Sequence, residues 1–261
     1  MEQTLLTARL TRSVLLSEKT KHLELEVEEL SSFDFVAGQF ISVREPRGEN
    51  KFVTRAYSIA SAPRGNNTFD LCLNRVEEGF MSNFLCSLDV GETAHFHGPH
   101  GLFVLKPEVE DVVLVATGTG VAPFRSMARD LFGVDRASQP GTRQQTPLRP
   151  PALGGRHHHN GRQIWLVYGT RYPEDIYYRE EFEQLAAGEP NFHYIATLSR
   201  PPESWRGERG YVQEHVRKIV GARQDMHVYI CGLNEMVSSV RKLLVEECCW
   251  DKHRVIYERY D

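Results

Sequence analysis

The sequence lacks any apolar stretch long enough to cross a bilayer, because its longest apolar runs, such as residues 112–116, span only a few positions. It also lacks a basic excess: 31 Lys and Arg residues stand against 35 Asp and Glu residues, for a formal net charge of −4. Dedicated nucleic-acid-binding proteins usually carry such an excess. No basic segment followed by an apolar one opens the chain. We therefore expect a cytoplasmic protein that neither inserts into a membrane nor binds nucleic acid.

Cysteine is scarce and scattered, with five residues in the whole chain. No pair of CxxC motifs is present, which argues against a structural zinc site. No CxxxxCxxC run is present, so a plant-type iron–sulfur cluster is not expected on this chain. We predict reduced thiols and no bound metal. The cysteines are Cys72, Cys86, Cys231, Cys248 and Cys249.

The first hundred residues read as short strands separated by Gly, Pro and Asn, a pattern typical of a β-barrel or sandwich. Ser82 is the expected N-cap of one short helix over residues 83–88. The expected strands cover residues 23–27, 40–43, 56–59 and 69–76.

After Pro107, apolar strands alternate with helices, which predicts a parallel sheet covered on both faces. We place a domain boundary near Lys106, which divides the chain into residues 1–106 and 107–261. The second half has expected strands over residues 112–116, 164–168, 192–197, 228–231 and 254–260, and expected helices over residues 122–131, 178–187, 212–220 and 235–247.

Residues 133–162 fit neither pattern, being rich in Gly, Pro, Gln and Arg. So long a loop is unusual inside a compact domain, and we predict an inserted surface loop. It includes His157, His158 and His159. Consecutive residues on regular backbone cannot all face one ion, so these histidines do not predict a metal site.

Two segments have the form of anion-binding sites. The segment TGTGVAP (residues 117–123) joins a strand to a helix, and its glycines let backbone N–H groups approach a phosphate. In the first half, Arg55 is suited to clamp a phosphate and Tyr57 offers a flat stacking surface. The helix beginning near Ser82 offers a second N-terminus. The glycine turn favours a ligand over an ordinary turn, whereas each segment of the first half, taken singly, is more often an ordinary strand or capped helix.

Taken together, five motifs occur in an order that resembles the ferredoxin–NADP⁺ reductase family, close to its plant-type branch. The segments SNFLC (residues 82–86), APFRS (122–126) and REEFE (179–183) resemble the same branch. The resemblance covers nearly the whole chain apart from residues 133–162. The five motifs are Arg55-x-Tyr57-Ser58, Gly79-x-x-Ser82, residues 117–123, Tyr229-Ile230-Cys231-Gly232 and Glu258-Arg259-Tyr260.

The resemblance implies a six-stranded antiparallel FAD-binding barrel followed by a five-stranded parallel-sheet domain that binds NADP(H). It implies that Arg55 contacts the FAD pyrophosphate, that Tyr57 stacks on the flavin and that Ser58 lies at flavin N5. The other implied FAD contacts are Ala56, Cys72, Leu73, Asn74, Gly79, Phe80, Met81, Ser82 and Tyr260. An aromatic segment that meets the FAD adenine in plant-type members is missing, which leaves the adenine contact open.

The resemblance also implies four catalytic residues: Ser58, Cys231, Glu258 and Tyr260. Cys231 would pack beside the nicotinamide, Glu258 would relay protons, and Tyr260 would cover the flavin face that the nicotinamide must reach. The implied NADP contacts are Thr117, Gly118, Thr119, Gly120, Ala122, Pro123, Ser199, Arg200, Arg209, Tyr211, Gln213, Cys231, Gly232 and Leu233.

NADP(H) is favoured over NAD(H) because Arg200 and Arg209 together suit a 2′-phosphate dianion, and Tyr211 can stack on adenine. We therefore expect an enzyme that moves electrons between NADP(H) and ferredoxin or flavodoxin, as a monomer. Two alternatives remain open. One is an NAD(P)H-dependent reductase component of an oxygenase or a flavin reductase, and the other is a non-catalytic flavin-binding regulatory module.

Overall fold

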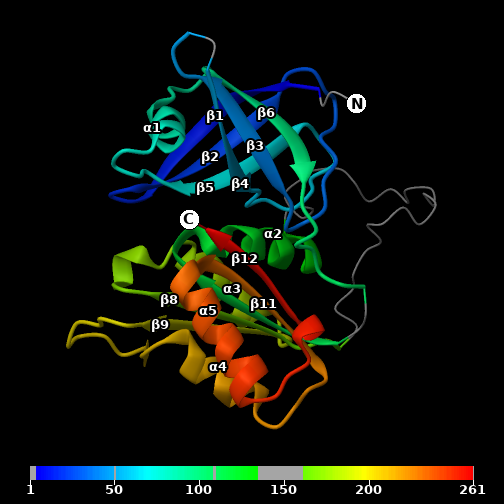
Figure 1. Cartoon of the computed structure of the whole chain (residues 1–261), viewed down its shortest axis with the longest axis vertical. Helices are drawn as coiled ribbons and strands as arrows, with labels where there is room; N and C mark the ends of the chain where they lie inside the picture. The colour runs from blue at the N-terminus through cyan, green and yellow to red at the C-terminus, as the bar shows by residue number, and fades with distance from the viewer. Residues whose placement is uncertain (1–3, 50, 108–109, 135–160, 261) are drawn as a thin grey trace.

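The computed structural model describes residues 4–49, 51–107, 110–134 and 161–260. Its strands form two separate sheets, one from each half of the chain, stacked along the long axis (Figure 1). Most of the predicted insertion over residues 133–162, including His157, His158 and His159, lies outside the described residues. Among those described, no helix combines the length and apolar character needed to cross a bilayer.

The first sheet is a six-stranded antiparallel barrel, as expected. Its order is β4-β3-β6-β1-β2-β5, and a bridge between Ile59 and Leu71 joins the two outer strands. The sequence pattern missed β1 and β6, in which Arg, Thr and His residues dilute the apolar signal. The strands are β1 (Leu6–Ser17), β2 (Thr20–Val27), β3 (Phe40–Pro46), β4 (Phe52–Ser58), β5 (Thr68–Asn74) and β6 (Thr93–His100).

Alternating residues of these strands point into the barrel and form its core. Phe69 and Phe96 pack against Phe33 with ring centroids 5.2 and 5.5 Å away. Each fully buried phenylalanine stabilises the fold by roughly 1.5–3 kcal/mol. The apolar interior therefore makes the barrel a rigid support for the residues on its rim.

The helix α1 (Phe80–Ser87) differs from the prediction at its start. Gly79 is the N-cap, so the expected capping role of Ser82 is wrong. The Ser82 hydroxyl donates to the Gly79 carbonyl and accepts from the Val76 N–H, which stabilises the preceding turn. No side chain caps the helix, so its first N–H groups remain available to a ligand.

The second sheet is parallel, with order β10-β9-β8-β7-β11-β12. It has the five expected strands and one more, the two-residue β10, which pairs with the end of β9 at the edge. The hydrophobic pattern of the sequence did not predict β10, because two charged residues give no apolar signal. The strands are β7 (Asp111–Thr117), β8 (Ile164–Thr170), β9 (Phe192–Leu198), β10 (Glu208–Arg209), β11 (Met226–Leu233) and β12 (Val255–Tyr260).

Helices cover both faces of this sheet, which is why its strands are apolar throughout. The helices α2 (Val121–Leu131) and α3 (Arg179–Gly188) pack on one face. The helices α4 (Val212–Val220) and α5 (Asn234–Arg241) pack on the other (Figure 1). The last helix is shorter than the predicted 235–247, because a π-helical turn replaces it over Lys242–Glu247.

The two sheets meet through α2, which lies directly beneath the barrel (Figure 1). Ala60, Cys72 and Phe103 from the barrel side share one apolar core with Ala122 and Phe124 of α2. A shared core of this kind fixes the two halves relative to each other. The proposed domain boundary near Lys106 remains a prediction.

Candidate functional site

The turn between β7 and α2 has the geometry of an anion cradle. Residues Gly118–Gly120 form a 3₁₀ turn that leads into α2, and no side chain caps that helix. Gly118 has φ +53°, and open space surrounds the position a Cβ would take. The Val121 N–H donates within the turn, to the Gly118 and Thr119 carbonyls, and Pro123 has no N–H. Binding of a phosphate to the remaining N–H groups of this turn stays a prediction.

The end of β11 packs against the same turn so closely that only glycine fits. A Cβ on Gly120 would lie 2.3 Å from the Cys231 carbonyl oxygen, and one on Gly232 would lie 2.3 Å from Thr117 Oγ1. The Leu233 N–H donates to that hydroxyl at 3.4 Å. The sheet order places β8 on one side of β7 and β11 on the other, so the chain is wound outward in both directions from β7. Open parallel sheets bind ligands at such a point, outside the carboxyl ends of their strands.

Cys231 is completely buried at this point. Burial raises the pKa of its thiol well above the ordinary value. The thiol therefore stays protonated at neutral pH and is unsuited to nucleophilic attack. This agrees with a role in packing against a bound ring rather than in covalent chemistry.

Tyr260 joins the end of β12 to the barrel. Its hydroxyl donates to Ser58 Oγ at 2.5 Å, across the junction between the two sheets. Burial raises the pKa of Tyr260, so the phenol remains a donor throughout the neutral range. Three of the four predicted catalytic residues, Ser58, Cys231 and Tyr260, are thus brought together from three different strands.

Glu258 is the fourth predicted catalytic residue, and it lies two residues before Tyr260 on β12. It is paired in register with Cys231, and its Oε1 would be 4.0 Å from a Cβ on Gly101. Burial raises the pKa of its carboxyl to about 7. A carboxyl that titrates near neutrality can both release and accept protons, which suits general acid–base chemistry.

We expect the raised pKa of Glu258 to make stability pH-dependent. Between the ordinary carboxyl value of 4.5 and about 7, the folded protein holds a proton that the unfolded chain has released. The stabilisation is therefore complete at low pH and is lost as pH rises through about 7. The unfolding free energy of the apoprotein minus that of Glu258→Gln should fall across this window.

Urea unfolding at several pH values measures this difference. Glu246→Gln serves as the control, because Glu246 is an exposed glutamate of the same half of the chain. A flat difference between pH 5 and pH 8 for Glu258→Gln would contradict the raised pKa.

The predicted flavin-side residues come from β4, β5 and α1, and they differ in exposure. Arg55 is exposed, with its guanidinium bonded to the neighbouring Thr54 carbonyl at 2.9 Å, and Tyr57 is half-buried. Helix α1 lies beside β4 and presents its uncapped N-terminus. An exposed guanidinium, an uncapped helix and an aromatic ring fit a dinucleotide that carries a pyrophosphate and a flat ring. Of the remaining predicted residues on this side, Ala56 and Asn74 are exposed, Phe80 is half-buried, and Cys72, Leu73 and Met81 are buried in the cores.

The predicted 2′-phosphate readers gather beyond the end of β9. Arg200 and Arg209 are exposed, and carbonyls of Pro202 and Trp205 hold the Arg209 guanidinium at 3.3 and 3.0 Å. Tyr211 is 66% exposed. Gln213 Oε1 is buried and has no hydrogen-bond partner within the described part of the chain. Arg200 and Tyr211 are thus open to solvent, whereas Arg209 already donates to two carbonyls, and binding of the adenosine end here stays a prediction. Ser199 lies at the same strand end.

Sequence reasoning missed one group of residues. A buried polar network lies between the barrel and α2, in which Asp70 is close to both His22 and Arg125. Arg125 belongs to the APFRS segment, but nothing in the pattern shows that its charge points into the protein. The structure also shows Gly101 beside Glu258, which no motif indicated.

Comparison with known proteins places both halves in recognised families. Residues 7–105 match the family described as "Oxidoreductase FAD-binding domain", and residues 114–242 match the "Oxidoreductase NAD-binding domain". Ferredoxin--NADP reductase B of Sorangium cellulosum is 41% identical, with 97% of each chain covered. The 2-halobenzoate 1,2-dioxygenase electron transfer component of Burkholderia cepacia is 29% identical over 95% of this chain and 65% of its own length.

Solved structures share the fold. A ferredoxin NADP+ reductase from Neisseria gonorrhoeae with bound FAD and NADP superimposes with a TM-score of 0.72. It is 20% identical, and 99% of each chain is covered. The arrangement of barrel, parallel sheet and junction therefore recurs over the full length of that protein.

Proposed function

The chain belongs to the ferredoxin–NADP⁺ reductase family, and on that premise we propose that it is an NADPH-dependent FAD enzyme that exchanges electrons with a one-electron carrier. The observation that carries the proposal is the meeting of Ser58, Cys231 and Tyr260 at the junction of two cradles, one in each half. Two dinucleotides bound in these cradles would meet at this junction.

The residues on the barrel rim would hold FAD. Arg55 and the N-terminus of α1 would bind its pyrophosphate, and Tyr57 would stack on its ring system. The turn over residues 117–123 would bind the NADP(H) pyrophosphate, while Arg200 and Arg209 would bind the 2′-phosphate. The support is chemical, since each position offers the donor or ring that the group requires. Bound FAD supplies the ability to accept a hydride and to release electrons singly.

The chain's own groups then orient the reacting partners and handle protons. Ser58 Oγ and Tyr260 OH share a hydrogen bond that a ligand at the junction would have to replace. Cys231 keeps its thiol protonated and offers a small, water-excluding surface. Glu258 supplies or takes up a proton near neutral pH. Proximity and orientation at this junction are the main contributions that the protein makes.

Ferredoxin or flavodoxin is the proposed carrier. This finer assignment is supported by the Sorangium relative, whose name is ferredoxin--NADP reductase B and whose length matches this chain. The second candidate is a reductase that serves an oxygenase, favoured by the similarity to the Burkholderia electron transfer component. That relative is longer than this chain, which spans about two thirds of it.

Anaerobic mixing with NADPH tests the proposal. The purified protein is expected to be yellow, and its flavin absorbance should bleach on addition of NADPH much more efficiently than on addition of NADH. Cytochrome c reduction should then increase when ferredoxin or flavodoxin is added. A colourless protein that takes up no FAD would refute the proposed function, and a clear preference for NADH would favour the oxygenase-type reductase.

A further inference from the structure

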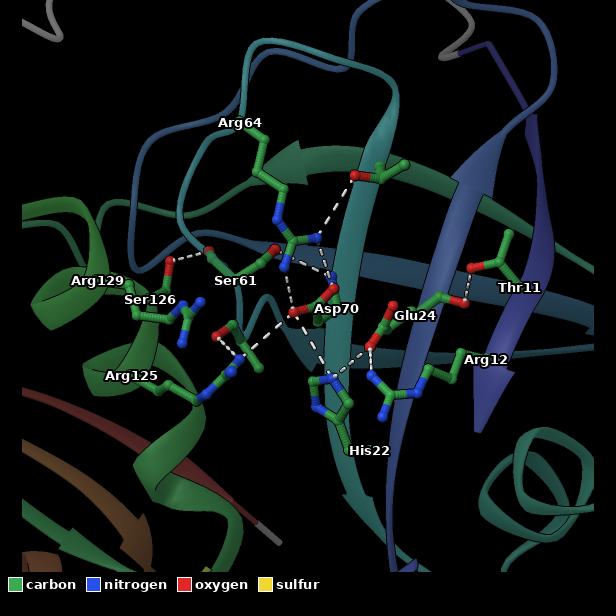
Figure 2. A network of polar contacts seen from close by, with 12 residues as sticks. Thr11, Arg12, His22, Glu24, Ser61, Arg64, Asp70, Arg125, Ser126 and Arg129 are labelled. Carbon is green, nitrogen blue, oxygen red and sulfur yellow. Dashed lines mark hydrogen bonds and ion pairs between the residues drawn. The ribbon is translucent and has the colours of Figure 1, made fainter. Parts of the chain in front are cut away.

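Arg125 on α2 makes polar contacts with both halves of the molecule. Arg125 Nη1 donates to the Ala60 carbonyl at 2.9 Å and lies 3.4 Å from Asp70 Oδ2. On its other side, the guanidinium pairs with Glu181 Oε2 at 2.9 Å. Figure 2 shows the side chain reaching from α2 toward the barrel. One side chain thus contacts the barrel and α3 at the same time.

The contacts of Arg125 fall next to both predicted cradles. Ala60 follows Ser58 by two residues, and Asp70 precedes Cys72 by two residues on β5. Arg125 itself lies in the first half of α2, the helix that follows the predicted anion cradle at Gly118–Gly120. The guanidinium therefore connects the backbone proposed to flank the flavin with the helix proposed to bind NADP(H).

The barrel side of this contact is held firmly. Arg64 forms two hydrogen bonds of 2.7 Å with the Asp70 carboxylate, and the Asp70 N–H donates to Ser61 Oγ at 3.0 Å. Ser126, next to Arg125, donates to the Ser61 carbonyl at 2.5 Å. Burial alone would raise the pKa of Asp70, but the bonds from Arg64 outweigh it, and the pKa lies below its ordinary value. The carboxylate stays charged and fixed in position.

Stability alone gives a weak reason for such a contact. The side chains of Arg125 and Asp70 are only 8% and 2% exposed, and buried ion pairs often add no more stability than apolar residues of similar size. What the planar guanidinium provides is geometry, because its several N–H donors point in fixed directions. It also stacks over the Tyr178 ring, 4.4 Å from the centroid.

We propose that Arg125 is a positioning residue, which sets the placement of the nicotinamide relative to the flavin by locking α2 to Ala60 and Asp70 of the barrel. The proposal rests on the proposed function. It acts through the two cradles and not through contact with either cofactor. Errors in placement of about 1 Å can slow a reaction by as much as 100-fold, so a lock of this kind affects rate more than affinity.

The test compares two variants of the FAD-loaded protein, Arg125→Gln and Arg64→Gln. Both remove one cation from the same Asp70 carboxylate, but Arg64 lies within the barrel half, whereas Arg125 joins the two halves. Stopped-flow absorbance measures the flavin reduction rate at saturating NADPH. We expect about a tenfold or larger fall for Arg125→Gln. Arg64→Gln should cause a clearly smaller fall, because it loosens Asp70 but leaves the contacts of Arg125 with Ala60 and Glu181 in place.

The affinity for adenosine 2′,5′-bisphosphate separates positioning from general damage. Because that ligand occupies only the second half, its dissociation constant should change less than twofold in Arg125→Gln. Arg125→Lys keeps the charge but cannot serve Ala60 and Glu181 together, so its rate should lie between those of wild type and Arg125→Gln. If Arg125→Gln does not fold, Arg125→Lys is measured in its place. A flavin reduction rate of Arg125→Lys within twofold of wild type then overturns the proposal.

Hydrogen exchange of the apoprotein gives a readout that needs no turnover. Amides of β5 and of the first turn of α2 should exchange faster in Arg125→Gln than in Arg64→Gln. Equal rates of flavin reduction in wild type and Arg125→Gln, or an equal loss in the two variants, would overturn the positioning role. Failure of NADPH to reduce the wild-type flavin would instead refute the proposed function, while the exchange comparison would still decide whether Arg125 locks the junction.

Discussion

A variant that carries both Arg200→Ala and Arg209→Ala is expected to lose about 100-fold or more in kcat/KM for NADPH. A charge-assisted hydrogen bond to a phosphate contributes roughly 1.5–3 kcal/mol, and every 1.4 kcal/mol is about a factor of ten. Both guanidiniums are exposed beyond β9, where the proposed 2′-phosphate would lie. NADH lacks that phosphate, so kcat/KM for NADH should change by less than about threefold.

Steady-state kinetics with both nucleotides check this expectation. Arg206→Ala is the matched control, because Arg206 is an exposed arginine of the same loop whose guanidinium bonds to the Glu203 carbonyl at 2.9 Å. It should leave both kcat/KM values nearly unchanged. Arg209 also holds the carbonyls of Pro202 and Trp205, so the NADH value reports any loss of loop structure. An equal loss with both nucleotides would show that these residues do not read the 2′-phosphate.

Replacement of Gly120 by alanine is expected to distort the turn between β7 and α2, where the NADP(H) pyrophosphate is proposed to bind. The added Cβ would lie 2.3 Å from the Cys231 carbonyl oxygen and 2.6 Å from its carbonyl carbon. Backbone atoms cannot rotate away as a flexible side chain can, so β11 and the turn must separate. Forced overpacking of this kind typically costs about 1–3 kcal/mol. We expect the affinity for NADP⁺ to fall by about tenfold or more.

Isothermal titration of NADP⁺ into the FAD-loaded variant measures the loss. Gly188→Ala is the control, because no atom lies within 4 Å of a Cβ at Gly188, at the end of α3. That variant should bind NADP⁺ normally. Wild-type affinity in Gly120→Ala would show that the close approach of the turn and β11 is not needed for binding.

These predictions are linked by the carboxyl ends of the parallel strands, which lie along one edge of the sheet. The β9 and β10 ends carry the arginines, β7 carries the glycine turn, and β11 carries Cys231. A nucleotide bound along this edge would be held by charge at one end and by shape at the other. Loss of either contact should therefore weaken binding, and we propose that Glu258 and Tyr260 act at the reacting end.

The sequence by itself determined the fold class and the composition of both cradles. Apolar strands of residues 112–116 and 228–231 must be buried on both faces, which demands helices on either side. The order of the five short motifs likewise resembles that of the family. Glycines at 118 and 120 before a helix suit the close approach of a phosphate. These conclusions rest on patterns within short segments, which can be recognised from the sequence without the tertiary structure.

Only the tertiary structure decided which residues meet across the junction. Ser58 and Tyr260 are 202 positions apart, and Arg125 and Asp70 are 55 apart, so no periodicity could pair them. The pKa of Glu258 near 7 likewise comes from burial by neighbouring elements rather than from its own strand. The N-cap of α1 is Gly79 rather than Ser82 for a local reason, since the Ser82 hydroxyl bonds to the Gly79 carbonyl and the Val76 N–H in the preceding turn. Placement and environment arise only when distant segments pack, and the chemistry of this site depends on both.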